Sequence, residues 1–137
     1  MAQILAFDYG TKRTGIAATD DLQIIASPIT TIDTHQLFEF IKDYLEINTV
    51  EAFVMGMPVN TRGESTQATA PAQKFAEKLQ KTYPKIPLHF VDERFTSKMA
   101  FQAMIDGGVP KKKRRDKATI DKVAAAIILQ SFLEERG

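Results

Sequence analysis

The order of the apolar runs restricts the fold of this chain more than any other feature of the sequence. Three short runs follow one another with only turn-sized gaps between them, at 3–9, 14–20 and 23–32. Runs this short and this close together predict three strands of an antiparallel meander. Beyond them the pattern changes, because segments with apolar residues at helical spacing alternate with further short apolar runs. An antiparallel start followed by this alternation indicates an α/β protein with a mixed sheet.

The remaining elements follow from the same patterns. A helix is expected from Thr34, a good N-cap, to about Asn48. Further strands are expected at 50–57 and 86–93, and further helices at 68–83, at 96–105 and at 117–135. Helical crossovers between strands normally give parallel pairing with right-handed connections. We therefore expect a five-stranded sheet, with three antiparallel strands followed by parallel ones and helices on both faces. In such sheets, ligands bind at the carboxyl ends of the strands.

Length and composition limit the classes of site. The 137 residues suit a single domain over 1–137. Because the chain has no cysteine, disulfides, thiolate metal sites and cysteine nucleophiles are excluded. His35 and His89 lie far apart in sequence and have no second ligand at helical spacing, which argues against a histidine-based zinc site. No run approaches the ~20 apolar residues of a membrane span, and no signal peptide is recognisable. We expect a cytoplasmic protein without a membrane partner.

Two glycines near the N-terminus raise the question of a phosphate-binding loop. Gly10 and Gly15 have the spacing of such a loop, but Ile16 and Ala17 stand where its lysine and its Ser/Thr hydroxyl belong. The pattern therefore argues against this loop, and Asp8 needs another explanation.

Acidic residues stand at the ends of separate elements. Asp8 ends the first strand, Asp92 and Glu93 end the fifth, and Asp121 begins the apolar stripe of the last helix. Because side chains alternate along a strand, only one of Asp92 and Glu93 is expected to face the crevice. Carboxylates from separate elements suit Mg²⁺ or Mn²⁺ and metal-assisted phosphoryl transfer. Structural roles remain open, since Asp8 can accept bonds from its own turn and Asp121 can interact with the helix N-terminus.

The net charge of +1 alone argues against a nucleic-acid-binding protein, but the basic residues are unevenly distributed. Six of them fall within the seven positions 111–117. Such a run is typical either of a nucleic-acid patch or of a solvated loop, and the two interpretations have equal support.

Three motifs together resemble the YqgF/RuvX family of nucleases. They are the segment at 8–15 (DYGTKRTG), the segment at 92–97 (DERFTS) and the segment at 121–130 (DKVAAAIILQ), to which 55–58 (MGMP) with Asn60 and Gly63 can be added. The resemblance extends over nearly the whole chain in the same order. It implies a single ribonuclease-H-like nuclease domain, related to the RuvC Holliday-junction resolvases.

The resemblance also implies a catalytic and metal-binding triad of Asp8, Glu93 and Asp121, holding Mg²⁺ or Mn²⁺. In one departure from the resolvase-like relatives, the fourth strand ends at 57–60 (MPVN) without an acid, so that ligand role would fall to Glu93. We expect nuclease action in 5′-end processing of the 16S ribosomal RNA precursor, by a monomer or a homodimer. The alternative is resolution of Holliday junctions in branched DNA.

Basic residues are expected to position the nucleic-acid backbone, because phosphate contacts fix register without reading sequence. They are Lys12, Arg13, Arg62, Arg94, Lys111, Lys112, Lys113, Arg114 and Arg115.

Two other classes explain part of the sequence. An actin-like ATPase also carries an Asp-x-Gly-Thr turn on its first strand, as at 8–11, but such proteins need two domains around the nucleotide and this chain has room for one. A non-catalytic RNA-binding module would use the acids only to finish strands. Metal-dependent cleavage that is abolished by a change at Asp8 distinguishes the nuclease from this module.

Overall fold

The computed structural model describes residues 2–57, 69–92 and 117–136. Its centre is a five-stranded sheet in the order β3-β2-β1-β4-β5. The strands are β1 (Gln3–Asp8), β2 (Arg13–Thr19), β3 (Ala26–Asp33), β4 (Val50–Met57) and β5 (Leu88–Asp92). The pairs β1–β2 and β2–β3 are antiparallel, whereas β1–β4 and β4–β5 are parallel. The predicted mixed sheet is confirmed.

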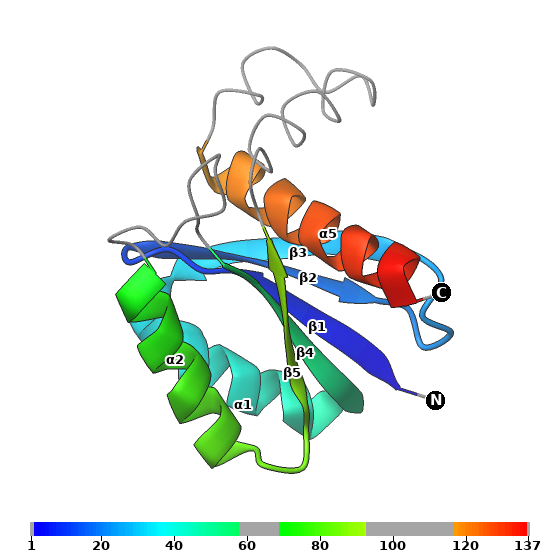
Figure 1. The fold of residues 1–137 in the computed structure, drawn as a ribbon, viewed down its shortest axis with the longest axis horizontal. Helices are drawn as coiled ribbons and strands as arrows, with labels where there is room; N and C mark the ends of the chain where they lie inside the picture. The colour runs from blue at the N-terminus through cyan, green and yellow to red at the C-terminus, as the bar shows by residue number, and fades with distance from the viewer. Residues whose placement is uncertain (1, 58–68, 93–116, 137) are drawn as a thin grey trace.

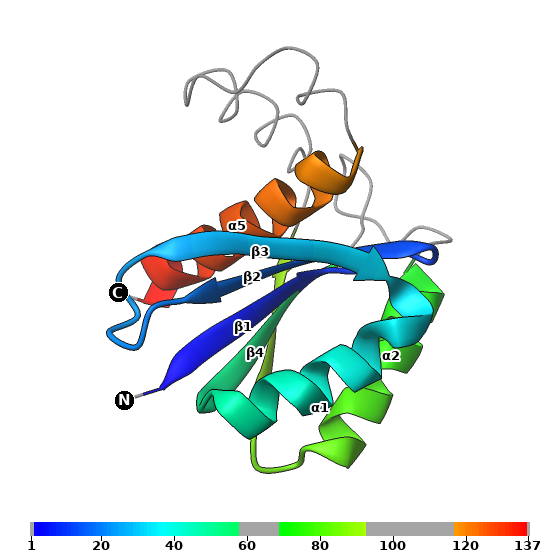
Figure 2. The ribbon, with the colours of Figure 1, turned by 180° about the vertical axis from the view of Figure 1, so that it is seen from behind.

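Helices cover both faces of the sheet (Figure 1). The short 3-10 helix η1 (Thr34–Gln36) leads into α1 (Leu37–Ile47), which lies with α2 (Thr69–Thr82) on one face. The long helix α5 (Lys117–Arg136) lies across the other face. Figures 1 and 2 show that α2 and α5 begin at the end of the sheet where β1 ends. None of the described helices is long and apolar enough to cross a membrane.

The central strand explains why the first apolar run is continuous. Ile4, Leu5, Ala6 and Phe7 are all at most 1% exposed, because β1 is covered on both faces. Leu5 and Phe7 belong to the apolar core beneath α1 and α2, and Ile4 and Ala6 to the core beneath α5. Alternation along the strand therefore places Asp8 on the α5 face.

The core beneath α5 contains many small side chains. Ala6, Ala17 and Ala52 of the sheet pack in it with Ala125 and Ile128 of the helix. Small side chains on both surfaces let the helix backbone approach the strands closely. This close approach carries the first turn of α5 towards the end of β1.

The third strand begins at Ala26, not at 23 as predicted, because the preceding residues form a turn. The Asp20 carboxylate accepts hydrogen bonds from the backbone N–H groups of Ile24 (2.8 Å) and Ile25 (2.9 Å). Gln23 within this turn has a positive φ of 59°. Figure 2 shows β3 running along the outer edge of the sheet.

Two other predicted boundaries need correction. Thr34 is not the N-cap of a helix, because it begins η1, and α1 follows with Gln36 at its N-cap position. The fifth strand begins at Leu88, not at 86, since Ile86 donates its N–H to the Tyr83 carbonyl in a turn (3.1 Å). The helix predicted at 96–105 lies outside the described residues.

Candidate active site

Asp8 is the last residue of β1 and pairs with Gly15 of β2. Directly opposed residues of an antiparallel pair project towards the same face of the sheet. The Asp8 side chain therefore faces α5, and so does the side of Gly15 on which a side chain would lie. The Asp8 side chain is partly exposed, although the strand before it is buried. The sheet therefore presents one carboxylate at the point where its central strand ends.

Gly15 brings the last helix to this carboxylate. A Cβ atom added to Gly15 would lie 2.0 Å from the backbone oxygen of Asp121 and 2.3 Å from its backbone carbon. No side chain fits there, because the obstructing atoms belong to the helix backbone. Gly15, the residue that pairs with Asp8, thus allows the α5 backbone at Asp121 to touch β2. The structure brings Asp8 and Asp121 to the same corner of the sheet.

Arg13 also reaches this corner. Its Nε donates a hydrogen bond to Oδ2 of Asp121 at 3.2 Å, and the two side chains are 41% and 25% exposed. The helix acid is therefore neither deeply buried nor fully solvated, and it already has a cationic partner. Sequence reasoning assigns Arg13 to the nucleic-acid backbone and does not foresee this ion pair.

The turn between β1 and β2 is held by Thr34. The Thr34 hydroxyl donates to the Gly10 carbonyl (2.5 Å) and shares a hydrogen bond with the Thr14 hydroxyl (2.9 Å). The Thr34 N–H donates to the Lys12 carbonyl (2.9 Å). A Cβ at Gly10 would lie 2.4 Å from the Arg13 carbonyl oxygen, so this glycine serves the tightness of the turn. Both ends of the turn are thereby fixed beside Asp8.

Alternate side chains of strand β5 face α5. The His89 ring packs against that of Phe132 of α5 in a tilted arrangement, with ring centroids 5.0 Å apart, and Val91 belongs to the core beneath that helix. Leu88 instead packs against the core beneath α1 and α2. The predicted alternation along this strand is confirmed for Leu88, His89 and Val91.

Only part of the predicted site falls within the described residues. Glu93, Arg62, Arg94 and the basic residues at 111–115 lie outside them. Lys12 is exposed on the turn after β1. Within the parts of the chain that the structure describes, no three His, Cys, Asp or Glu side chains form a group able to hold a metal ion. The described site thus consists of Asp8 and Asp121 with Arg13.

The contact between Gly15 and α5 is the feature of this site that sequence reasoning missed. A signal was present in the sequence, since 15–18 contains a glycine and two alanines in a strand segment with a single β-branched residue. A glycine within a strand can indicate that another backbone approaches closely. The Arg13 ion pair has no comparable signal, because its partner is 108 positions away.

A comparison with protein families matches residues 2–135 to a family described as "RuvX: Holliday junction resolvase". Curated relatives carry the name "Putative pre-16S rRNA nuclease". One from Christiangramia forsetii is 51% identical over 135 residues, which is 98% of this chain and 100% of the relative. Another, from Phocaeicola vulgatus, is 50% identical over 99% of this chain and 98% of the relative.

Solved structures resemble the fold at much lower sequence identity. Fowlpox virus resolvase, in a complex with Holliday junction DNA, superposes with a TM-score of 0.59 at 12% identity, covering 98% of both chains. RuvC from T. thermophilus, in complex with a Holliday junction substrate, gives a TM-score of 0.59 at 17% identity and covers 100% of this chain and 97% of RuvC. The ribonuclease-H-like fold expected from the sequence is thereby confirmed.

Proposed function

The chain belongs to the RuvX family, and we propose that it is a metal-dependent nuclease that processes the 5′ end of the 16S ribosomal RNA precursor. The observation that carries this proposal is the meeting of Asp8 and Asp121 at the carboxyl end of β1, through the contact of Gly15 with α5. The choice of RNA rests on the names of the relatives that are about 50% identical.

The residues at this corner fit a hard divalent cation. Asp8 and Asp121 offer only oxygen donors, which Mg²⁺ and Mn²⁺ prefer, and both side chains are accessible from solvent. When bound, such an ion supplies Lewis-acid polarisation of the phosphate and an activated water. Arg13, which donates one hydrogen bond to Asp121, would offer its remaining N–H groups to a phosphate oxygen.

Glu93 is proposed as the third acid, in preference to Asp92. Support comes from β5, where His89 and Val91 both face α5. A residue two positions beyond Val91 on an unbroken strand would share that face, whereas its neighbour would face away. Asp8 and Asp121 also lie on the α5 face, so Glu93 is the acid of the pair that suits the site.

The phosphate backbone of the substrate would be held by basic residues around this end of the sheet. Lys12 and Arg13 lie on the turn and strand beside Asp8. We include Arg62, Arg94 and the basic residues at 111–115 in this role on the strength of the sequence alone. The protein would act as a monomer or a homodimer.

A second candidate function is Holliday-junction resolution. The description of the matching family favours it, because that description names a Holliday junction resolvase. Branched DNA is therefore the alternative substrate that the experiment must include.

The test compares cleavage of matched single-stranded RNA, duplex and four-way-junction DNA with Mg²⁺ or Mn²⁺. Asp8→Asn, Asp121→Asn and Glu93→Gln should each lower kcat/KM by about 100-fold or more, because loss of a residue that only orients a metal ligand already costs roughly 10- to 100-fold. Asp92→Asn is the matched control beside Glu93 and should retain most activity.

Thermal unfolding of each variant is the control that distinguishes a loss of activity from a loss of folded protein. If Asp8→Asn and Asp121→Asn both kept wild-type turnover, the corner formed by Asp8 and Asp121 would not be the active site. Faster cleavage of the four-way junction than of any RNA would transfer the function to the second candidate.

A further inference from the structure

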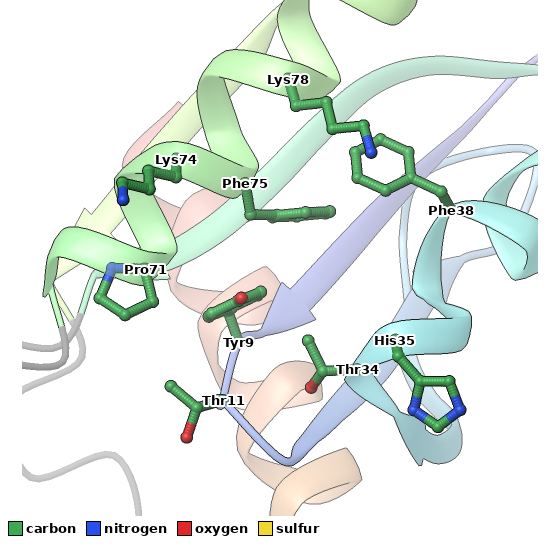
Figure 3. Close-up of a pocket in the computed structure, with 9 residues that line it drawn as sticks. All are labelled: Tyr9, Thr11, Thr34, His35, Phe38, Pro71, Lys74, Phe75 and Lys78. Atoms are coloured by element: carbon green, nitrogen blue, oxygen red, sulfur yellow. The ribbon is translucent and has the colours of Figure 1, made fainter.

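A pocket with a volume of about 470 Å³ opens on the other side of the turn that follows Asp8 (Figure 3). Figure 3 shows Tyr9 at its base, with side chains of η1 and α1 on one side and side chains of α2 on the other. This volume lies within the range of sites that bind small ligands, about 300–1,000 Å³. It is large enough for one unit of a larger molecule.

The charge of the pocket has one sign. Lys74 and Lys78 of α2 line it, and no Asp or Glu is among its nine lining residues. The Lys78 Nζ lies 4.5 Å from the centre of the Phe38 ring, in a cation–π contact. A ligand suited to this pocket is therefore negatively charged and can pack against aromatic rings.

The aromatic surface is fixed by the core beneath it. Tyr9 stacks on Phe75 at a centroid distance of 5.1 Å and an interplanar angle of 20°. Phe75 is only 7% exposed, and its ring also meets that of Phe38 at 5.2 Å. These rings therefore need little rearrangement to receive a flat partner. Base–aromatic stacking of this kind tolerates any base, because every base has a π-face.

The pocket and the candidate active site share one short piece of backbone. Asp8 faces α5, whereas Tyr9, the next residue, packs on the core beneath α1 and α2. The Cα atoms of consecutive residues are about 3.8 Å apart. Thr34 holds the turn that follows through the Gly10 and Lys12 carbonyls, and it also lines the pocket. A nucleic-acid strand crossing the end of β1 would meet both places.

We propose that this pocket holds one nucleotide of the substrate strand, adjacent to the phosphate that lies at Asp8 and Asp121. Lys74 and Lys78 contact its phosphate, and its base lies against Tyr9 and Phe38. This inference rests on the proposed nuclease function, to which it adds a subsite for a single-stranded segment. The chemistry recognised is that of a nucleoside monophosphate, whether it belongs to a strand or is free in solution.

The first experiment measures binding of a single-stranded RNA oligonucleotide in EDTA, where cleavage does not interfere, at several salt concentrations. The Lys74→Gln/Lys78→Gln variant should bind more weakly and flatten log K against log[salt] by about 0.7, because the two lysines together neutralise one phosphate and each neutralised phosphate contributes about 0.7 to the slope. Lys81→Gln/Lys85→Gln is the matched control, since it removes the same charge from the end of α2 and the loop after it. The control should leave the slope nearly unchanged.

The second experiment locates the base directly. An oligonucleotide with 4-thiouridine at one position should cross-link on irradiation to the peptide containing Tyr9 or to that containing Phe38. Excess adenosine monophosphate should compete poorly, because it cannot make the contacts of the neighbouring nucleotides. Competition by the free nucleotide at the affinity of the oligonucleotide would instead make this a free-nucleotide site and overturn its assignment to the strand.

Cleavage assays on the same proteins separate the two proposals. If the wild-type protein cleaves RNA while the pocket variant keeps the wild-type salt slope and cross-link, the subsite is wrong and the nuclease assignment stands. If the pocket variant loses binding and the cross-link but no protein cleaves, the subsite stands and the nuclease assignment fails. A wild-type protein that neither binds nor cross-links the oligonucleotide overturns the subsite.

Discussion

Arg13 is the residue whose role changes most between sequence and structure. As a cation in a motif near Asp8, it is predicted from the sequence to hold a nucleic-acid backbone. In the structure its Nε is bonded to Oδ2 of Asp121, so one of its five donors is already used by the site itself. A guanidinium in this position neutralises a carboxylate that would otherwise add to the negative charge around Asp8.

Replacing Arg13 should therefore change metal binding before it changes anything else. Arg13→Gln should tighten Mn²⁺ binding by up to about fivefold in calorimetry, because a partly exposed ion pair is worth about 0.2–1 kcal/mol and the metal no longer competes with it. Lys12→Gln is the control, since it removes a neighbouring charge without breaking the ion pair. Weaker Mn²⁺ binding in Arg13→Gln would show that the guanidinium orients Asp121 for the metal.

Asp20 provides a pH-dependent contribution to stability. Hydrogen bonds from the backbone N–H groups of Ile25 and Ile24 hold the pKa of Asp20 below its usual range. A carboxyl group whose pKa is lower in the folded than in the unfolded state stabilises the folded protein. This stabilisation is fully present at a pH above the unfolded-state pKa of about 3.9, and it is lost as the pH falls through the folded-state pKa.

We predict that Asp20→Ala lowers Tm at neutral pH and that the difference from wild type narrows as the pH falls below about 4 and passes through the lower folded-state pKa, where the folded wild-type carboxylate becomes protonated. Asp21→Ala is the neighbouring control, because the Asp21 carboxylate makes a long hydrogen bond of 3.5 Å with Gln3. A Tm difference that stays constant down to pH 2 would mean that the charge of Asp20 is not what closes the turn.

At the scale of elements, the close contact between β2 and the backbone of α5 limits where the helix can lie on the sheet. The backbone of α5 at Asp121 and Lys122 occupies the space that any side chain at position 15 would need. A single glycine in β2 thus limits where the first turn of a helix from the other end of the chain can lie on the sheet.

Gly15→Ala should destabilise the protein by about 1–3 kcal/mol, the usual cost of overpacking, and lower Tm by several degrees. It should also reduce cleavage beyond the loss of folded protein, because α5 must move and take Asp121 with it. Ala17→Gly is the control on the same face of β2, since it weakens the strand without displacing the helix. Equal specific activity in Gly15→Ala and Ala17→Gly would show that the contact between Gly15 and α5 does not position the active site.

At the scale of the molecule, most of the architecture could be predicted because burial determines it. The continuous apolar runs at β1 and β4 are those of strands covered on both faces, and the stripe on α5 packs where its period indicates. The shared face of Asp8 and Asp121 follows from strand alternation and helical spacing. What could not be predicted depends on single polar contacts between distant residues, such as Thr34 with Gly10 and Arg13 with Asp121.

The pocket beside Tyr9 belongs to the same class of features. Its walls come from η1 and α1, which sequence periodicity predicts as one helix, and from α2, which it predicts as another. Periodicity identifies the face of a helix that is buried, but it does not measure the gap left between two helices above a turn. The position of Lys74 and Lys78 around that gap therefore had to come from the structure.

The position of β1 at the centre of the sheet has a consequence for the order in which the protein is made. Asp8 leaves the ribosome with the first strand, whereas Asp121 follows only with the last helix, after every strand of the sheet has been synthesised. The meander of β1, β2 and β3 pairs strands that are close in sequence and can form while translation continues. The carboxylates can meet only once α5 has emerged and docked against Gly15. A chain still being translated, or one truncated before its last helix, therefore lacks the completed corner of Asp8 and Asp121.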